Sequence, residues 1–218
     1  MIKPIVILIF LTSVLSGCIG MSVPRAPSAS FIRGDLLLED DFNRSGAWHE
    51  YDRPELQMEV FSGVYRVEMR GGAYVWALNA QMHENVVIEI DTRAFAEKDR
   101  NGFGVMCRAD PNNDGDGYYF LIGSDGTYSI RRGTGREVEA LVAWDRSPAI
   151  NTGQASNRLR VLCIDDYLAL YVNDQFVTET RDTRYHRGFT GLAAVALDNA
   201  PVIVEFDGLR VWSASLAP

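Results

Sequence analysis

The sequence predicts an all-β domain in which two antiparallel sheets pack face to face. Short segments in which apolar and polar residues alternate follow one another along the chain after residue 33, and they are rich in Val, Ile, Tyr and Phe. Gly, Asn and Asp separate these segments, as in Asp125-Gly126 and Asn173-Asp174. No segment after residue 18 shows the 3.6-residue period of an amphipathic helix. Greek-key connections between the sheets are expected.

The expected strands follow the period-2 segments in chain order. They are Leu36–Phe42, Gln57–Phe61, Val64–Met69, Ala73–Leu78, Asn85–Ala94, Gly102–Ala109, Gly117–Ile122, Thr127–Arg131, Glu137–Trp144, Arg158–Asp165, Tyr167–Val172, Gln175–Thr180, Gly188–Ala196 and Val202–Trp212. The pair Asn173-Asp174 predicts a tight two-residue hairpin, because both residues tolerate the left-handed backbone that such a turn requires. Residues 34–218 form one domain in this interpretation, with no second linker and no internal repeat.

The N-terminus has the layout of a secretory signal over residues 1–17. Lys3 precedes an apolar run that ends at Leu15, shorter than the roughly 20 residues that a spanning helix needs. The run ends in Leu15-Ser16-Gly17-Cys18, which resembles the lipobox of bacterial lipoproteins. That resemblance implies cleavage before Cys18 and acylation of its thiol, which would attach the mature chain to the lipid bilayer. The alternative is an ordinary signal that happens to contain a cysteine.

Residues 18–33 are expected to be the lipidated cysteine and a flexible tether. The segment contains Pro24, Pro27 and several serines and has no structural period. The expected location is the extracytoplasmic side of the cell envelope. Ile19, and not an aspartate, follows Cys18, and in a cell with two membranes the absence of aspartate there resembles the pattern for sorting to the outer membrane. The outer membrane and the outer face of the plasma membrane both remain open.

The charge of the chain excludes one class of partner. The net charge is −8 and the pI is about 4.9, and loss of Lys3 with the signal makes the mature chain more negative still. Nucleic acid requires a basic surface, so it is not an expected partner. Anionic lipid would not attract such a chain either, so acylation would have to supply the anchoring.

Two cysteines remain for the folded domain. Alternation within their strands places Cys107 and Cys163 on the apolar face, so both are expected to point into the core. An oxidising compartment would permit a disulfide between them. Two buried thiols acting as small apolar side chains are the alternative, because sequence spacing does not establish proximity.

The order of the segments resembles the concanavalin A-like lectin/glucanase jelly roll, including laminin-G-like and 3-keto-disaccharide hydrolase-like domains. The stretches that carry the resemblance are Asp40-Asp41-Phe42, Gly46-Ala47-Trp48, Gly63–Val67, Asn101–Val105 with Arg108, Tyr118–Ile122, Trp144, Ser147–Ile150, Asn157–Val161, Leu170–Asp174, Gly188–Leu192 and Phe206–Val211. The resemblance implies a curved sandwich whose concave sheet often binds sugars. It does not imply a reaction, because enzymes, lectins and adhesion modules share the fold.

No complete catalytic motif is found. Glu89-Ile90-Asp91 begins like the Glu-x-Asp-x-x-Glu motif of laminarinase-type glycosidases, but Ala94 occupies the position of the proton donor. Glu205 and Asp207 form a second carboxylate pair, and the family resemblance favours a structural role in a turn for Asp207. His49, His83 and His186 lack metal-ligand spacing. No cofactor is therefore expected to be required.

Charges of both signs alternate with apolar residues on several strands. The candidate ligand-binding residues are Arg66, Glu68, Glu89, Asp91, Arg93, Arg108, Tyr119 and Arg160. On one sheet face they would suit the hydroxyl groups of a glycan, with Tyr74, Trp76, Tyr119 and Trp144 as stacking aromatics. The alternatives are a solvated face with charges paired across strands and aromatics buried in the core.

The loop from Asp110 to Asp116 resembles the first half of a calcium loop. Asp110, Asn112, Asp114 and Asp116 are the candidate ligands, but Leu121 replaces the closing glutamate. A polar hairpin turn explains the run equally well. Calcium is accordingly the one metal ion whose binding the sequence suggests.

These observations predict a membrane-anchored extracytoplasmic binding protein that recognises a carbohydrate on one polar sheet face. One alternative is a carbohydrate-active enzyme of the 3-keto-disaccharide hydrolase or lyase type. The other is an adhesion or assembly module that binds protein.

Overall fold

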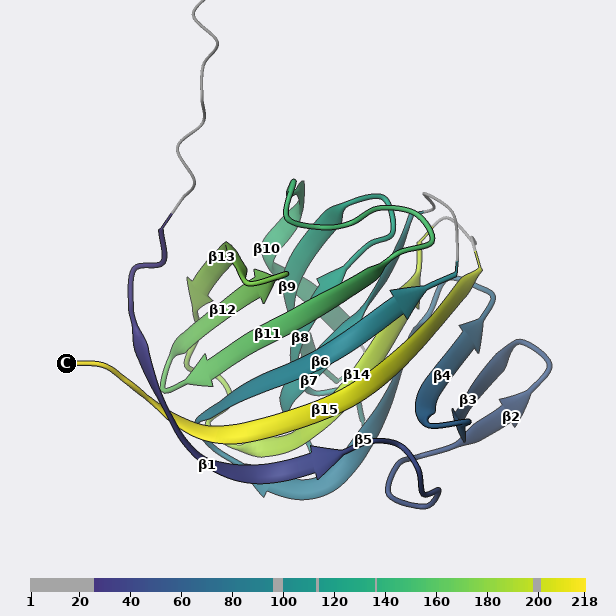
Figure 1. Cartoon of the computed structure of the whole chain (residues 1–218), viewed down its shortest axis with the longest axis horizontal. Coiled ribbons are helices and arrows are strands. Elements are labelled where there is room, and N and C mark those ends of the chain that lie inside the picture. Colours follow the sequence, from purple (N-terminus) through teal and green to yellow (C-terminus); the bar gives the residue numbers. More distant parts are fainter. Residues whose placement is uncertain (1–25, 96–99, 113, 136, 198–200) are drawn as a thin grey trace, which may run out of the picture.

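The computed structural model describes residues 26–95, 100–112, 114–135, 137–197 and 201–218, and this part of the chain folds into two layers of strands (Figure 1). The strands are β1 (Phe31–Asp40), β2 (Tyr51–Arg53), β3 (Leu56–Phe61), β4 (Val64–Met69), β5 (Tyr74–His83), β6 (Val86–Ala94), β7 (Asn101–Ala109), β8 (Gly117–Ile122), β9 (Thr127–Thr134), β10 (Glu137–Arg146), β11 (Ser156–Ile164), β12 (Tyr167–Val172), β13 (Gln175–Arg181), β14 (Gly188–Ala196) and β15 (Val202–Leu216). The predicted all-β sandwich of two antiparallel sheets is confirmed.

The two sheets differ in size and in strand order. The nine-stranded sheet has the order β13-β12-β11-β6-β15-β4-β3-β2, and β1 pairs with the C-terminal half of β15. The six-stranded sheet has the order β10-β9-β8-β7-β14-β5. Strands distant in sequence are therefore neighbours: β6 lies between β11 and β15, and β14 lies between β5 and β7. Such crossovers are what Greek-key connections produce.

Period-2 alternation builds the core between the sheets. In β4, Tyr65 and Val67 are buried while Arg66 and Glu68 are more exposed, because successive side chains point to opposite faces of a strand. The same alternation brings Phe103, Val105, Phe120 and further residues of both sheets into one apolar cluster. Strands β7 and β8 are buried on both faces, so the six-stranded sheet has a covered outer face as well.

Most predicted strands agree with the structure. The differences are one strand that was not predicted and several strands whose ends are shifted. The strand Val64–Met69 and the hairpin turn Asn173-Asp174 are as predicted, and both turn residues have positive φ angles of 51° and 63°. The sequence did not indicate β2, because three residues are too few to show a period. β1 begins at Phe31, earlier than the predicted Leu36.

The N-terminal predictions concern residues that the structure does not describe. The signal at residues 1–17, Cys18 and residues 19–25 of the tether lie outside the described residues. The flexible tether was predicted to run to residue 33, and that end is wrong, because residues 31–33 already pair with β15 as the start of β1. Within the described part, no helix has the length and hydrophobicity that crossing a bilayer requires.

One covalent link joins the two sheets in the described part of the chain. Cys107 on β7 and Cys163 on β11 form a disulfide across the core, with their Cα atoms 6.7 Å apart. Both residues are buried, and both belong to the cluster between the sheets. Of the two alternatives that the sequence left open, the structure contains the disulfide.

Candidate functional site

The outer face of the nine-stranded sheet carries rows of charged side chains that cross its central strands. Backbone register places Glu205 opposite both Arg66 and Arg93, and places Asp91 opposite both Asp207 and Arg158. Glu89 lies between Arg160 and Arg210 in the next row. The strands β4, β15, β6 and β11 therefore present one continuous polar surface, which we call the polar face.

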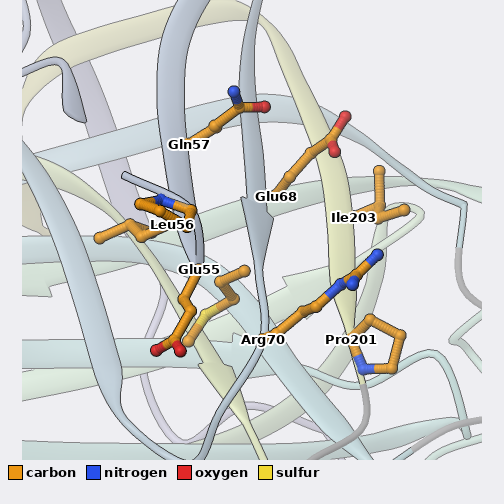
Figure 2. Close-up of a pocket in the computed structure, with 9 residues that line it drawn as sticks. Glu55, Leu56, Gln57, Glu68, Arg70, Pro201 and Ile203 are labelled. Carbon is orange, nitrogen blue, oxygen red and sulfur yellow. The ribbon is translucent and has the colours of Figure 1, made fainter. Parts of the chain in front are cut away.

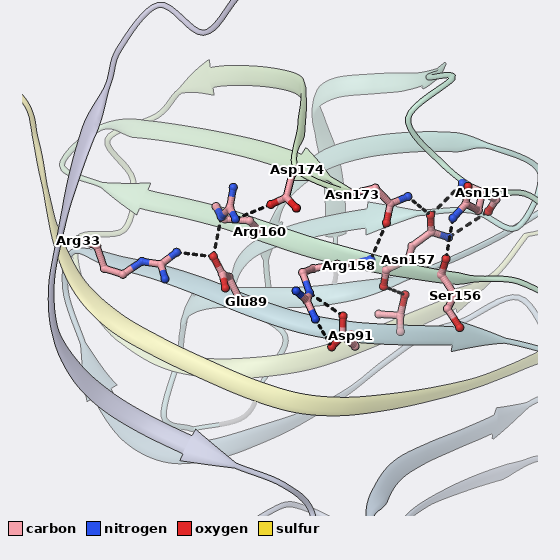
Figure 3. A network of polar contacts seen from close by, with 11 residues as sticks. Arg33, Glu89, Asp91, Asn151, Ser156, Asn157, Arg158, Arg160, Asn173 and Asp174 are labelled. Atoms are coloured by element: carbon pink, nitrogen blue, oxygen red, sulfur yellow. Dashed lines mark hydrogen bonds and ion pairs between the residues drawn. The ribbon is translucent and has the colours of Figure 1, made fainter.

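Most charges on the polar face are paired across strands (Figure 3). Glu89 accepts a 2.6 Å hydrogen bond from Arg160 Nε and also contacts Arg33, while Arg160 Nη2 donates to Asp174 at 2.6 Å. Arg158 binds Asp91 in a bidentate manner, at 2.8 and 2.9 Å. These bonds raise the pKa of Arg158. Such pairing holds the side chains in fixed positions but does not remove them from solvent, since Arg158 is 53% and Asp91 48% exposed.

Asp207 breaks the pattern of paired charges. It lies directly opposite Asp91 on the neighbouring strand, and like charges in that position destabilise a sheet. Asp91 binds Arg158, whereas the exposed Asp207 carboxylate has no ion pair or hydrogen bond with any described residue. A positive φ at the following Gly208 accompanies an irregularity in the register. The fold gains nothing from this carboxylate pair.

Two adjoining hollows open around these carboxylates. One, of about 340 Å³, is lined by residues of four strands that include Asp91, Arg93 and Asp207. The other, of about 310 Å³, is lined by Arg158, Asp174 and neighbours, and both hollows share Asp91 and Ser156. We call the two together the polar hollow. It runs across the strands from β4 to the β12–β13 turn.

A buried amide fixes one end of the polar hollow. The Asn157 carboxamide accepts hydrogen bonds from Asn151 N and Asn173 Nδ2, at 2.8 and 2.9 Å, and donates to Asn151 O at 3.0 Å (Figure 3). The two-residue turn that carries Asp174 is thereby fastened to the loop before β11. A site whose edges are held in this way is preorganised for a ligand.

Aromatic rings lie beside the other end. The guanidinium of Arg93 stacks 4.8 Å from the centroid of Phe95, and that of Arg66 lies 5.9 Å from both Phe95 and Phe61. Phe61 is 49% exposed. Arginine stacked on an aromatic ring keeps its hydrogen-bonding edge available to a ligand.

Six predicted ligand-binding residues do lie on the polar face. These are Arg66, Glu68, Glu89, Asp91, Arg93 and Arg160. Glu68 also lines a separate hollow of about 250 Å³ between β3, β4 and the start of β15 (Figure 2). Arg158, Ser156 and Asp174 were not among the predicted site residues, although Arg158 precedes Arg160 by two and shares its period. For Asp207 a structural role in a turn was expected, and the structure places it in the polar hollow.

Arg108 was predicted on the polar face, and that prediction is wrong. The residue is 3% exposed at one end of the sandwich, and burial lowers its pKa. Its guanidinium donates to the backbone oxygens of Glu84, Asp165 and Tyr185, at 3.1, 2.7 and 2.8 Å, and to Asn85 Oδ1 at 3.0 Å. A bulge in β7 explains the error, because Arg108 has φ of +53° and the register against β14 shifts there. Arg108 fastens connecting segments together.

The candidate aromatics were also expected beside the charges, and the structure places them on the opposite side of the molecule. Tyr74, Trp76, Tyr119 and Trp144 gather on the outer face of the six-stranded sheet. Tyr119 is fully buried, and its hydroxyl donates to Gly115 O at 2.7 Å. A Cβ atom at Gly115 would lie 2.9 Å from the Trp76 ring, so the loop before β8 closes over this face. Tyr119 is therefore not available to a ligand.

The predicted calcium loop is held by its own backbone. Asp110 accepts a hydrogen bond from Asn112 N at 2.7 Å, and Asp114 accepts one from Asp116 N at 3.1 Å, both typical of Asx turns. Asp116 accepts from the Tyr185 hydroxyl at 3.0 Å. In the described ranges no three His, Cys, Asp or Glu side chains converge as metal ligands would. Calcium binding here stays a prediction.

The stability of the sandwich is expected to fall at alkaline pH through Tyr118. Burial, together with a 2.5 Å hydrogen bond to Asp182, raises the pKa of Tyr118 to about 12, against about 10 in an unfolded chain. Because the folded pKa is the higher one, the stabilisation is complete below about pH 10 and is lost as pH rises towards 12. Urea unfolding at pH 8, 10 and 11 should show a flatter decline for Tyr118→Phe than for the wild type; equal slopes would contradict the assignment.

Comparisons with known proteins place the fold but no family. No protein-family model and no curated protein matches the sequence. Among solved structures, the chain is similar to the carbohydrate-binding module CBM66 of Bacillus subtilis, with 15% identity, a TM-score of 0.59, and coverage of 83% of this chain and 98% of that one. A Bacillus subtilis protein of unknown function with a galectin-like fold has a TM-score of 0.62, at 12% identity over 84% and 98% of the two chains. A Bacillus licheniformis β-glucanase has a TM-score of 0.57, at 10% identity over 83% and 98%. The chain thus has the concanavalin A-like jelly-roll sandwich fold.

Proposed function

We propose that this protein binds a carbohydrate in the polar hollow and that acylation of Cys18 holds it at the extracytoplasmic surface of a bacterial envelope. The observation that carries the binding proposal is the carboxylate pair Asp91 and Asp207, which face each other in an open hollow at a cost to the sheet. Groups retained against stability are expected where they serve a ligand. The anchor rests on the lipobox resemblance of residues 15–18.

The chemistry of the polar hollow suits sugar hydroxyl groups. Carboxylates accept hydrogen bonds from hydroxyls, and the guanidinium groups of Arg93 and Arg158 donate to them. A hydroxyl bound between Asp91 and Asp207 would relieve their repulsion by donating to either one. Phe95 offers an apolar surface beside Arg93 for the C–H face of a sugar ring.

The fold neighbours support the same class of ligand. The chain is similar over more than four fifths of its length to structures described as a carbohydrate-binding module and a β-glucanase. Their fold is shared by this chain, and their ligands are the reason to test glycans first. The open polar hollow, rather than the covered outer face of the six-stranded sheet, is the surface that we assign to the ligand.

Replacement of Asp207 by asparagine is expected to separate binding from stability. Asp207→Asn removes a like charge from the sheet, so the free energy of unfolding should stay the same or rise by about 0.2–1 kcal/mol. Affinity for an oligosaccharide identified on a glycan array should fall at least tenfold, because a carboxylate acceptor is lost. Isothermal titration calorimetry and urea unfolding measure the two effects.

Arg158→Ala should weaken binding to a similar extent, and Arg181→Ala is its matched control. Arg181 pairs with Asp166 at the sheet edge and is 52% exposed, close to the 53% of Arg158. Both pairs should contribute no more than about 1 kcal/mol to stability. Equal affinity of Arg158→Ala and the wild type, or an equal loss in Arg181→Ala, would count against the polar hollow as the site.

A further inference from the structure

One edge of the nine-stranded sheet carries apolar side chains that the fold leaves in solvent. The structure pairs β1 with β15 on one side. Ile32, Leu36 and Leu37 are 54%, 49% and 43% exposed, and they are three of the five exposed large apolar residues in the part of the chain that the structure describes. The other two are Phe61 on β3 and Met82 on β5. Exposed apolar residues gathered on one ten-residue strand mark an interaction surface.

The edge is poorly suited to the addition of a strand from another protein. The pairing of β1 with β15 shifts register twice, between Arg33 and Leu36 and again between Leu36 and Leu38. Such irregularities break the even spacing of free N–H and C=O groups that an added strand would need. The exposed side chains are therefore not explained by strand pairing.

The position of β1 in the chain indicates a different occupant. Phe31 follows Cys18 by 13 residues, which reach at most roughly 45 Å when fully extended. An acylated Cys18 would thus keep β1 near a bilayer. The negative net charge of the chain gives anionic headgroups no attraction for it, so contact with lipid would have to come from apolar side chains.

We propose that the β1 edge rests in the interface of the bilayer, with Ile32, Leu36 and Leu37 in contact with lipid. This inference rests on the acylation of Cys18 within the proposed function. Strand β1 pairs with residues 209–216 of β15, whereas β15 lines the polar hollow through Glu205 and Asp207. The hollow, which continues over β6 and β11, therefore stays in water. The tether then brings the domain to the membrane, and β1 sets its orientation there.

The test uses the full mature lipoprotein in phosphatidylcholine nanodiscs. Leu36→Cys and Phe61→Cys each add one free thiol, because Cys107 and Cys163 are bonded to each other and Cys18 is acylated. Leu36 and Phe61 are both 49% exposed, so Phe61 is the matched control. A bimane label at position 36 should be quenched by doxyl-labelled lipid at least twofold more than a label at position 61. Amides of residues 31–40 in the nanodisc-bound wild type should exchange more slowly than the same amides in the nanodisc-bound Leu36→Asp/Leu37→Asp variant.

Three results would overturn the docking. These are equal and weak quenching at positions 36 and 61, unchanged amide exchange in the double variant, and slowed exchange that needs a second protein in place of lipid. Intact-mass analysis of the same preparation distinguishes the causes of failure. An unmodified residue 18 removes the anchor and the docking together, whereas an acylated residue 18 with no preferential quenching removes the docking alone. Glycan affinity measured on the unlabelled wild type in nanodiscs is independent of either outcome.

Discussion

Replacement of Arg108 by methionine is expected to lower the free energy of unfolding by roughly 3–5 kcal/mol. The guanidinium is buried and donates to four acceptors in three connecting segments, contributed by Glu84 and Asn85, by Asp165, and by Tyr185. Methionine fills much of the same volume but donates nothing, so buried carbonyl oxygens lose their partners at about 1–3 kcal/mol each before relaxation. Urea unfolding followed by tryptophan fluorescence measures the loss.

Arg210→Met is the control for this experiment. Arg210 pairs with Glu39 at 2.8 Å, but both side chains are more than half exposed. An exposed pair contributes about 0–1 kcal/mol, so this variant should unfold almost like the wild type. A loss below 1 kcal/mol in Arg108→Met would show that Arg108 does not hold the connecting segments together.

Removal of the Cys107–Cys163 disulfide is expected to cost roughly 4 kcal/mol, from the loop entropy of the 56-residue separation that it closes. The double variant Cys107→Ala/Cys163→Ala replaces both sulfur atoms, and its denaturation midpoint should fall in proportion. Thiol titration of the denatured wild type should detect neither cysteine until reductant is added. Two free thiols, or a double variant as stable as the wild type, would contradict the bond.

The period-2 pattern is sufficient to predict the fold and the majority of its strands. It fails where the backbone departs from regular pairing. In β7 the extra residue at the bulge reverses the alternation after Cys107. The Arg108 side chain therefore points in a direction that the period-2 pattern predicts for the residues next to it. β2 escapes notice because three residues do not define a period.

The candidate site was predictable in part for a related reason. Alternation shows that Glu89 and Asp91 share the face opposite the core, but not which of two sheets carries that face. The charges of the nine-stranded sheet and the aromatics of the six-stranded sheet, such as Tyr119, therefore appeared to belong to one surface. Only the strand order, with β6 between β11 and β15, shows that Arg158, Asp91 and Asp207 meet.

A titration of the isotopically labelled protein with an array-selected oligosaccharide, followed by amide chemical shifts, tests the proposed binding surface most directly. We expect the largest shifts at Asp91, Arg93, Arg158, Asp174 and Asp207, around the polar hollow. Shifts confined to Tyr51, Tyr74 and Trp76, which line a hollow of about 140 Å³ between β2, β3 and β5, would contradict the account. So would the absence of saturable shifts anywhere.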